Sequence, residues 1–160
     1  MKYLVACSVL FGIVAIGESL GHPMFHRRNA VQVQVNGNWR VKFNLSGIGE
    51  KNLIFNSQRA GSGSFLLLDT GPDGKPAPDP LPGVWSQTTN NRVNFSGEVE
   101  LPLGTCCREV GTLILKGKFN STDVIAGRAI FIASTEDEEN FNGFRSTVGT
   151  FTATRVPDKN

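Results

Sequence analysis

The stretch at residues 35–47, VNGNWRVKFNLSG, constrains the fold of this chain more than any other. Apolar side chains occupy every second position from Trp39 to Leu45, and polar side chains occupy the positions between them. Successive side chains of a β-strand point to opposite faces of the sheet, so a period of two is typical of a strand with one buried face. Such a strand needs neighbours, because its apolar face must be covered.

Further strand-like stretches follow at short and regular spacing. Besides the strand that contains Trp39, we expect strands at residues 31–35, 51–57, 62–69, 84–89, 93–101, 110–116, 123–133 and 148–156. Asn36-Gly37 lies between the first two stretches and predicts a type I′ hairpin there. Residues 71–83, GPDGKPAPDPLPG, contain five prolines and predict an extended surface loop. The segments 102–108, 118–122 and 134–143 are expected to connect strands.

This pattern predicts an all-β fold, because no segment outside residues 1–21 has a helical period. The simplest arrangement is an antiparallel up-and-down meander closed into a barrel of about eight strands. Closure removes the exposed strand edges that an open sheet would carry. A β-sandwich remains the alternative, because the two architectures share the same pattern.

Three Gly-x-Phe steps occur in the expected strands or directly after one, at residues 63–65, 117–119 and 149–151. Glycine lets a strand coil sharply. We expect the aromatic ring two positions later to fill the space above each glycine.

Residues 1–21 have the features of a signal peptide. Lys2 precedes an apolar run at residues 3–16, and small residues follow at 15–17 and 19–21. The run is shorter than the roughly 20 apolar residues that cross a bilayer, and Glu18 follows it. We therefore expect a secreted or periplasmic protein with no membrane attachment after cleavage. The expected organisation is a signal peptide at 1–21, a flexible leader at 22–30, a β-barrel domain at 31–156 and a tail at 157–160.

Charge and cysteine content narrow the class of protein further. The net charge is +2 with both signs scattered along the chain, which predicts no surface for nucleic acid or anionic membranes. Outside the signal peptide the cysteines are the neighbours Cys106 and Cys107, which cannot cross-link distant parts of a fold. A vicinal disulfide, free thiols and pairing between chains all remain open. The sequons at Asn44, Asn94 and Asn120 matter only in a eukaryotic source.

Gly37-Asn38-Trp39 at the head of the first long strand, together with Arg155 in the last strand, resembles the arrangement of lipocalins and other calycins. The resemblance implies that Arg155 packs across the Trp39 ring at the closed end of a barrel, as a cation–π pair. The chain lacks the long-range disulfide, the T-D-Y-type motif and the terminal helix of lipocalins. It is also similar to β-rich proteins that bacteria secrete, which indicates a compartment but no activity.

Asp69-Thr70-Gly71 follows an apolar run and resembles the catalytic loop of aspartic proteases. Retropepsin-like enzymes supply the second aspartate by dimerisation, and residues 124–127 resemble their later apolar-apolar-glycine element. The alternative is a simple turn at the end of a strand, because Asp and Gly both favour turns.

Candidate metal ligands are few, and we expect no cofactor. His22 and His26 are the only histidines, and both lie in the leader. A copper site would need a further histidine from elsewhere. The acidic run at residues 136–140, and Asp69 with Asp73 and Asp79, lack the spacing that directs several oxygens at one Ca²⁺ ion.

These observations predict a non-enzymatic barrel that binds a small apolar ligand or a protein partner, in or on the barrel. A purely structural module and the Asp69 protease remain alternatives. Large and small residues are both expected to point inward, and their mixture leaves a cavity or allows tight packing. The large candidates are Trp39, Phe43, Phe95, Phe151 and Arg155, and the small ones are Gly97, Gly127, Ala129 and Ala153.

An intact-mass measurement of the exported protein tests the targeting prediction. We expect the mass of a chain that begins at Glu18 or His22, directly after one of the two small-residue patterns. A mass lower by two hydrogens than that of the reduced chain indicates a disulfide between Cys106 and Cys107. A mass that still includes residues 1–15 contradicts the signal peptide.

Overall fold

The computed structural model describes residues 33–71, 74, 79–103, 107–134 and 146–157, with Leu103 and Cys107 described by their backbone alone. The signal peptide predicted at 1–21, the leader at 22–30 and residues 158–160 of the tail lie outside the described residues. No helix in the described ranges is long and apolar enough to span a membrane.

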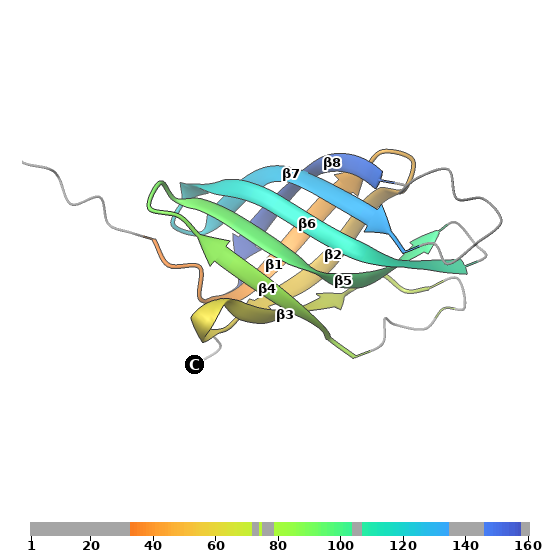
Figure 1. Cartoon of the computed structure of the whole chain (residues 1–160), viewed down its shortest axis with the longest axis horizontal. Coiled ribbons are helices and arrows are strands. Elements are labelled where there is room, and N and C mark those ends of the chain that lie inside the picture. Colours follow the sequence, from red (N-terminus) through yellow and green to blue (C-terminus); the bar gives the residue numbers. More distant parts are fainter. Residues whose placement is uncertain (1–32, 72–73, 75–78, 104–106, 135–145, 158–160) are drawn as a thin grey trace, which may run out of the picture. The chain divides into compact units, whose positions relative to one another are not determined.

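The described residues form a closed barrel of eight antiparallel strands in chain order, which confirms the predicted fold class (Figure 1). Its strands are β1 (Gly37–Leu45), β2 (Gly49–Ser57), β3 (Ser62–Leu67), β4 (Leu81–Gln87), β5 (Arg92–Leu103), β6 (Cys107–Ser121), β7 (Val124–Ala133) and β8 (Ser146–Arg155). A 3₁₀ turn, Arg59–Gly61, joins β2 to β3. Because β8 pairs with β1 from Trp39↔Arg155 to Leu45↔Gly149, the sheet has no edge, and the alternative of a β-sandwich is wrong.

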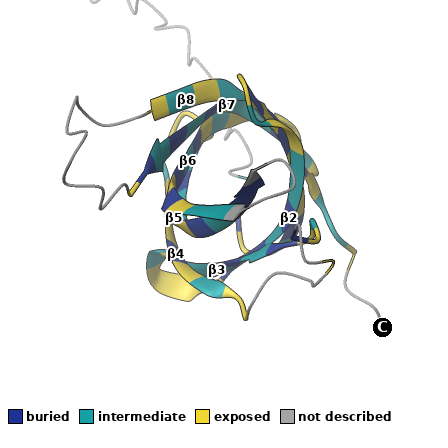
Figure 2. Ribbon diagram, turned by 90° about the vertical axis from the view of Figure 1, so that its right-hand side faces the viewer, coloured by how far each residue is buried: buried dark blue, intermediate teal, exposed yellow. Residues whose placement is uncertain are grey.

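Side chains alternate between the inside and the outside of the barrel, as the stretch around Trp39 predicts. In β1 the four apolar residues from Trp39 to Leu45 are at most 1% exposed, and the polar residues between them are exposed. Buried and exposed positions alternate in the same way around the barrel (Figure 2). The described core consists of Val35, Trp39, Val41, Phe43, Leu45, Leu53, Phe55, Phe65, Leu67, Val93, Phe95, Val99, Leu101, Leu113, Leu115, Ile125, Ala129, Phe131, Ala133, Phe151 and Ala153.

The hairpin predicted between residues 31–35 and the Trp39 strand is wrong. Residues 33–36 form no strand, while 31 and 32 lie outside the described residues. The reason is that β2 and β8 already occupy both edges of β1, so no ladder remains for a further strand. Gly37 has φ +119°, a conformation that favours glycine, and the chain enters β1 there.

Two predicted strand boundaries also differ from the structure. β4 begins at Leu81, inside the segment predicted as loop, and Pro82 is tolerated as its second residue because proline is compatible with the start of a strand. β6 continues to Ser121 through the connection predicted at 118–122, with a register shift between Phe119 and Ser121.

Glycines are paired across neighbouring strands, and aromatic rings lie over them. Gly63, Gly83 and Gly97 form one row across β3, β4 and β5. The predicted source of the covering ring is wrong at all three Gly-x-Phe steps. An added Cβ would meet the ring of Phe55 at Gly63, the ring of Phe151 at Gly117 and the backbone of Asn44 at Gly149. Phe65 lies instead over Gly83 and Gly97. An aromatic ring reaches its diagonal neighbour on the adjacent strand, which explains why Phe55 covers Gly63 and Phe65 covers Gly83.

Gly97→Ala tests this packing. An added Cβ would overlap the ring of Phe65 and come within 2.8 Å of the carbonyl oxygen of Pro82. We expect the free energy of unfolding in urea to fall by about 1–3 kcal/mol, the usual cost of overpacking. Ser96→Ala, the adjacent position on the outer face, is the matched control and should change it by less than about 0.5 kcal/mol. Equal effects of the two substitutions would contradict the packing of Phe65 over Gly97.

Candidate functional site

Trp39 and Arg155 meet at one end of the barrel. The guanidinium carbon of Arg155 lies 4.3 Å from the centroid of the Trp39 ring, which is the contact that the calycin resemblance implies. The ring of Phe119 meets Trp39 edge-on, with 5.9 Å between centroids. The Trp39 ring is therefore enclosed by packed side chains at this end.

Residues 33–36 are held across the same end by side chains of the barrel. Arg155 donates from Nη1 to the carbonyl oxygen of Asn36 (2.7 Å) and from Nη2 to that of Gln34 (2.6 Å). Trp39 Nε1 and Ser57 Oγ both donate to the carbonyl oxygen of Val35, at 2.6 and 2.5 Å. These carbonyls belong to no strand ladder. Val35 is buried, so Trp39 and Ser57 supply the partners that its buried carbonyl requires, whereas Gln34 and Asn36 are exposed. Side chains of the barrel therefore fix residues 33–36 across this end.

The interior candidates Phe43, Phe95 and Phe151 are 1%, 0% and 3% exposed. A cavity that held a ligand would leave part of the side chains lining it accessible. Phe151 also lies over Gly117, so space beside a small inward residue is occupied by a ring. A pocket that reaches Phe65 has a volume of about 10 Å³, which is the room of one water molecule. The described interior is therefore packed.

Asp69 takes part in the backbone ladder at the end of β3. Its Oδ2 accepts a hydrogen bond of 2.6 Å from the backbone N–H of Asn52, and the N–H of Leu68 donates to the carbonyl of Asn52 at 2.8 Å. The carboxylate thus continues the pairing of β2 with β3 by one step. This is the geometry expected of a turn that ends a strand.

The remaining sequence candidates are not brought together. Asp79 lies at the edge of the 10 Å³ pocket, near Glu98 and Glu100. Among the described residues, no group of three or more His, Cys, Asp or Glu side chains is placed to hold a metal ion. His22, His26, Asp73, Cys106, the side chain of Cys107 and residues 136–140 lie outside the described residues.

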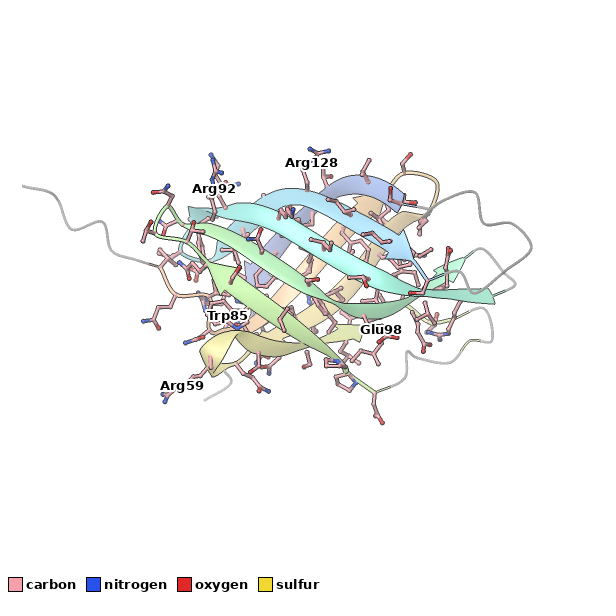
Figure 3. All side chains as sticks on the ribbon, viewed as in Figure 1. Arg59, Trp85, Arg92, Glu98 and Arg128 are labelled. Atoms are coloured by element: carbon pink, nitrogen blue, oxygen red, sulfur yellow. The ribbon has the colours of Figure 1, made fainter. Side chains whose placement is uncertain are left out.

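The outer wall carries a groove of about 540 Å³ across β5, β6 and β7, which also reaches Thr88 in the turn after β4. Arg92 and Arg128 project from this side of the barrel, and Arg59 projects from the opposite side (Figure 3). The described residues that line the groove include four cationic side chains and no acidic one. They are Thr88, Arg92, Asn94, Lys116, Gly117, Lys118, Ala126, Gly127 and Arg128.

Strand register places these cations in two directly opposed pairs. Arg92 faces Lys118 across β5 and β6, and Lys116 faces Arg128 across β6 and β7. Like charges in directly opposed positions destabilise a sheet. The ion pairs in the part of the chain that the structure describes involve none of these four residues. The floor between the pairs is glycine backbone, Gly117 against Gly127.

Sequence reasoning missed this groove, which we name the basic groove. Its four cationic residues are spread over residues 92–128 with acidic residues between them, so no basic cluster is visible in the sequence. The alternation within each strand places every one of them outside the barrel. Their proximity depends on the register between three strands, which sequence periodicity does not reveal.

Arg155→Lys tests the closed end. Lysine lacks the planar fork that reaches two carbonyls while it lies over an indole ring. We expect the free energy of unfolding to fall by about 1–3 kcal/mol in urea titrations followed by tryptophan fluorescence. Asp123→Asn removes the exposed ion pair of the same arginine and should cost less than about 0.5 kcal/mol. If Arg155→Lys lowered the free energy of unfolding by no more than Asp123→Asn does, this would contradict the role of Arg155 in holding residues 33–36.

Comparison with known proteins identifies no family. No family model matches the sequence, and no curated protein matches it significantly. Among solved structures, Xenavidin is similar at a TM-score of 0.44 and 20% identity, covering 78% of this chain and 99% of its own. A redesigned β-barrel is similar at a TM-score of 0.36 and 15% identity, covering 76% and 91% of the two chains. Both TM-scores lie below 0.5, so neither neighbour indicates a function for this chain.

Proposed function

We propose that this protein is a non-enzymatic binding module that takes its ligand on the outer wall of the barrel, in the basic groove. The observation that carries the proposal is the contrast between the two sides of the wall. The described interior is filled by side chains such as Trp39 and Phe95, whereas the outer face of β5–β7 has a concavity of about 540 Å³. Pockets that hold small molecules commonly have volumes of about 300–1,000 Å³.

An internal ligand has little support from this packing. Phe55 lies against Phe65 and Phe95, with 4.9 and 4.5 Å between ring centroids. A ligand would have to displace such rings, and removing a buried aromatic side chain costs about 3–5 kcal/mol. The same packing makes the barrel a rigid support, and binding sites on strands are held more precisely than sites on loops.

We propose that the protein acts outside the cytoplasm, as the signal peptide predicted at residues 1–21 implies. A protein partner remains compatible with it, because a partner would also contact the outer wall. A purely structural module is the alternative, and it predicts that no ligand binds the groove specifically.

A fragment screen by two-dimensional NMR of the isotopically labelled protein tests the proposal, because it detects binding without a chosen ligand. We expect the fragments that bind to shift amide signals of residues 92–94, 116–118 and 126–128. Ala126→Trp, which adds a bulky side chain to the groove floor, should abolish those shifts. Thr154→Trp, an outward position on β8, is the control and should leave them unchanged.

Two results would overturn the proposal. Fragments whose shifts cluster on inward-facing residues such as Phe43 and Phe151 would place the site inside the barrel. A screen in which no fragment binds the groove would favour the structural module.

A further inference from the structure

The basic groove concentrates positive charge in a small area. Adjacent strands are about 4.8 Å apart, and alternate residues of one strand are about 7 Å apart. Arg92, Lys118, Lys116 and Arg128 therefore project from an area roughly 10 Å across, and all four are exposed. A group with several negatively charged oxygens, such as phosphate or sulfate, can accept hydrogen bonds from several of these cations at once.

An apolar row follows directly beside the cations on the same outer wall. Ile114, Ile130 and Val148 are opposed across β6, β7 and β8, one step along the strands from the Lys116–Arg128 pair. Val148 is 47% exposed, and the two isoleucines are half-buried. Ile132 continues the row by a further step on β7. Outward positions of a water-facing barrel wall are ordinarily polar, so a contiguous apolar row indicates a contact surface.

The acidic side chain Glu98 lies on β5 one step beyond the row of Ile114, Ile130 and Val148, at the level of Ile132. Glu98 is opposite Thr112, which is opposite Ile132. The order along the wall is therefore cations, apolar residues and then a carboxylate. A ligand with one charged end fits this order in one orientation, with its anionic group at Lys116 and Arg128 and its apolar part over the isoleucines.

We infer that the basic groove binds a small anionic amphiphile, whose phosphate or sulfate group lies between the opposed cations and whose apolar body lies along Ile114, Ile130 and Val148. This inference rests on the proposed function and names the ligand class of the same site. A nucleic acid fits less well, because four cations confined to two rows do not form the long basic stripe that follows a phosphate backbone.

Titration calorimetry with decyl phosphate, used below the concentration at which it forms micelles, tests the inference. Inorganic phosphate supplies the charged group alone, and decyl maltoside supplies the chain with a neutral head. We expect decyl phosphate to bind at least tenfold more tightly than either probe. Its affinity should fall as salt is raised, because the cations are exposed and screened.

Variants assign the binding to the groove. Lys116→Gln combined with Arg128→Gln should weaken decyl phosphate binding at least tenfold. Ile130→Thr should weaken decyl phosphate and leave the affinity for inorganic phosphate unchanged. Arg59→Gln removes an exposed cation from the opposite side of the barrel and is the control for net charge, with no expected change. Near-ultraviolet circular dichroism of each variant confirms that the barrel is folded.

Several results would overturn the inference. Absence of decyl phosphate binding is one, and binding that the double variant leaves unchanged is another. Equal affinity for inorganic phosphate would reject the apolar half, and tighter binding of a single-stranded oligonucleotide would favour nucleic acid. If fragments bind the groove but decyl phosphate does not, this inference fails while the proposed function stands. If nothing binds the groove, both fail.

Discussion

Pairing of β8 with β1 is the interaction on which the rest of the structure depends. Seven matched residue pairs, from Trp39↔Arg155 to Leu45↔Gly149, turn an open meander into a closed wall. Once the wall is closed, every side chain on a strand points either into a narrow interior or out to solvent. An eight-stranded barrel encloses a space just wide enough for side chains to fill. The same ladder also leaves residues 33–36 without a strand to join, so side chains of the barrel end hold them instead.

Closure also explains the combination of large rings and glycines in the sequence. A narrow interior has no room for a ring at every inward position, so a ring on one strand requires a glycine on a strand one or two positions away. Phe65 lies over Gly83 and Gly97, and Phe151 lies over Gly117. On the outer face, the glycine pair Gly117–Gly127 leaves bare backbone, which becomes the floor of the basic groove. The arrangement that fills the interior therefore leaves a concavity outside.

The features that could be predicted from the sequence are those that depend on local periodicity. The strand around Trp39, its buried face and the up-and-down order follow from alternation and turn chemistry within short windows. The Trp39–Arg155 contact came from a resemblance that links two residues far apart in the chain. Features that depend on long-range register were not predicted. They are the contact of Phe55 with Gly63, the absence of a strand at residues 33–36 and the proximity of the four cations in the basic groove. A shift of two residues in β6 would keep Lys116 on the outer face but separate it from Arg128, and no local pattern decides between these two registers.

The two opposed cation pairs of the basic groove lower the stability of the barrel. Each pair of like charges across a ladder costs a few tenths of a kcal/mol to about 1 kcal/mol, and both pairs lie on strands whose inward residues already stabilise the sheet. Exchanging Lys116 for an acidic residue would convert a repulsive pair into an attractive one without touching the core. Such an attractive pair occurs elsewhere on the outer wall, where Lys42 Nζ lies 2.9 Å from Glu50 Oε2. Stability alone therefore gives no reason to gather four cations around one groove, whereas an anionic ligand would neutralise them when it binds.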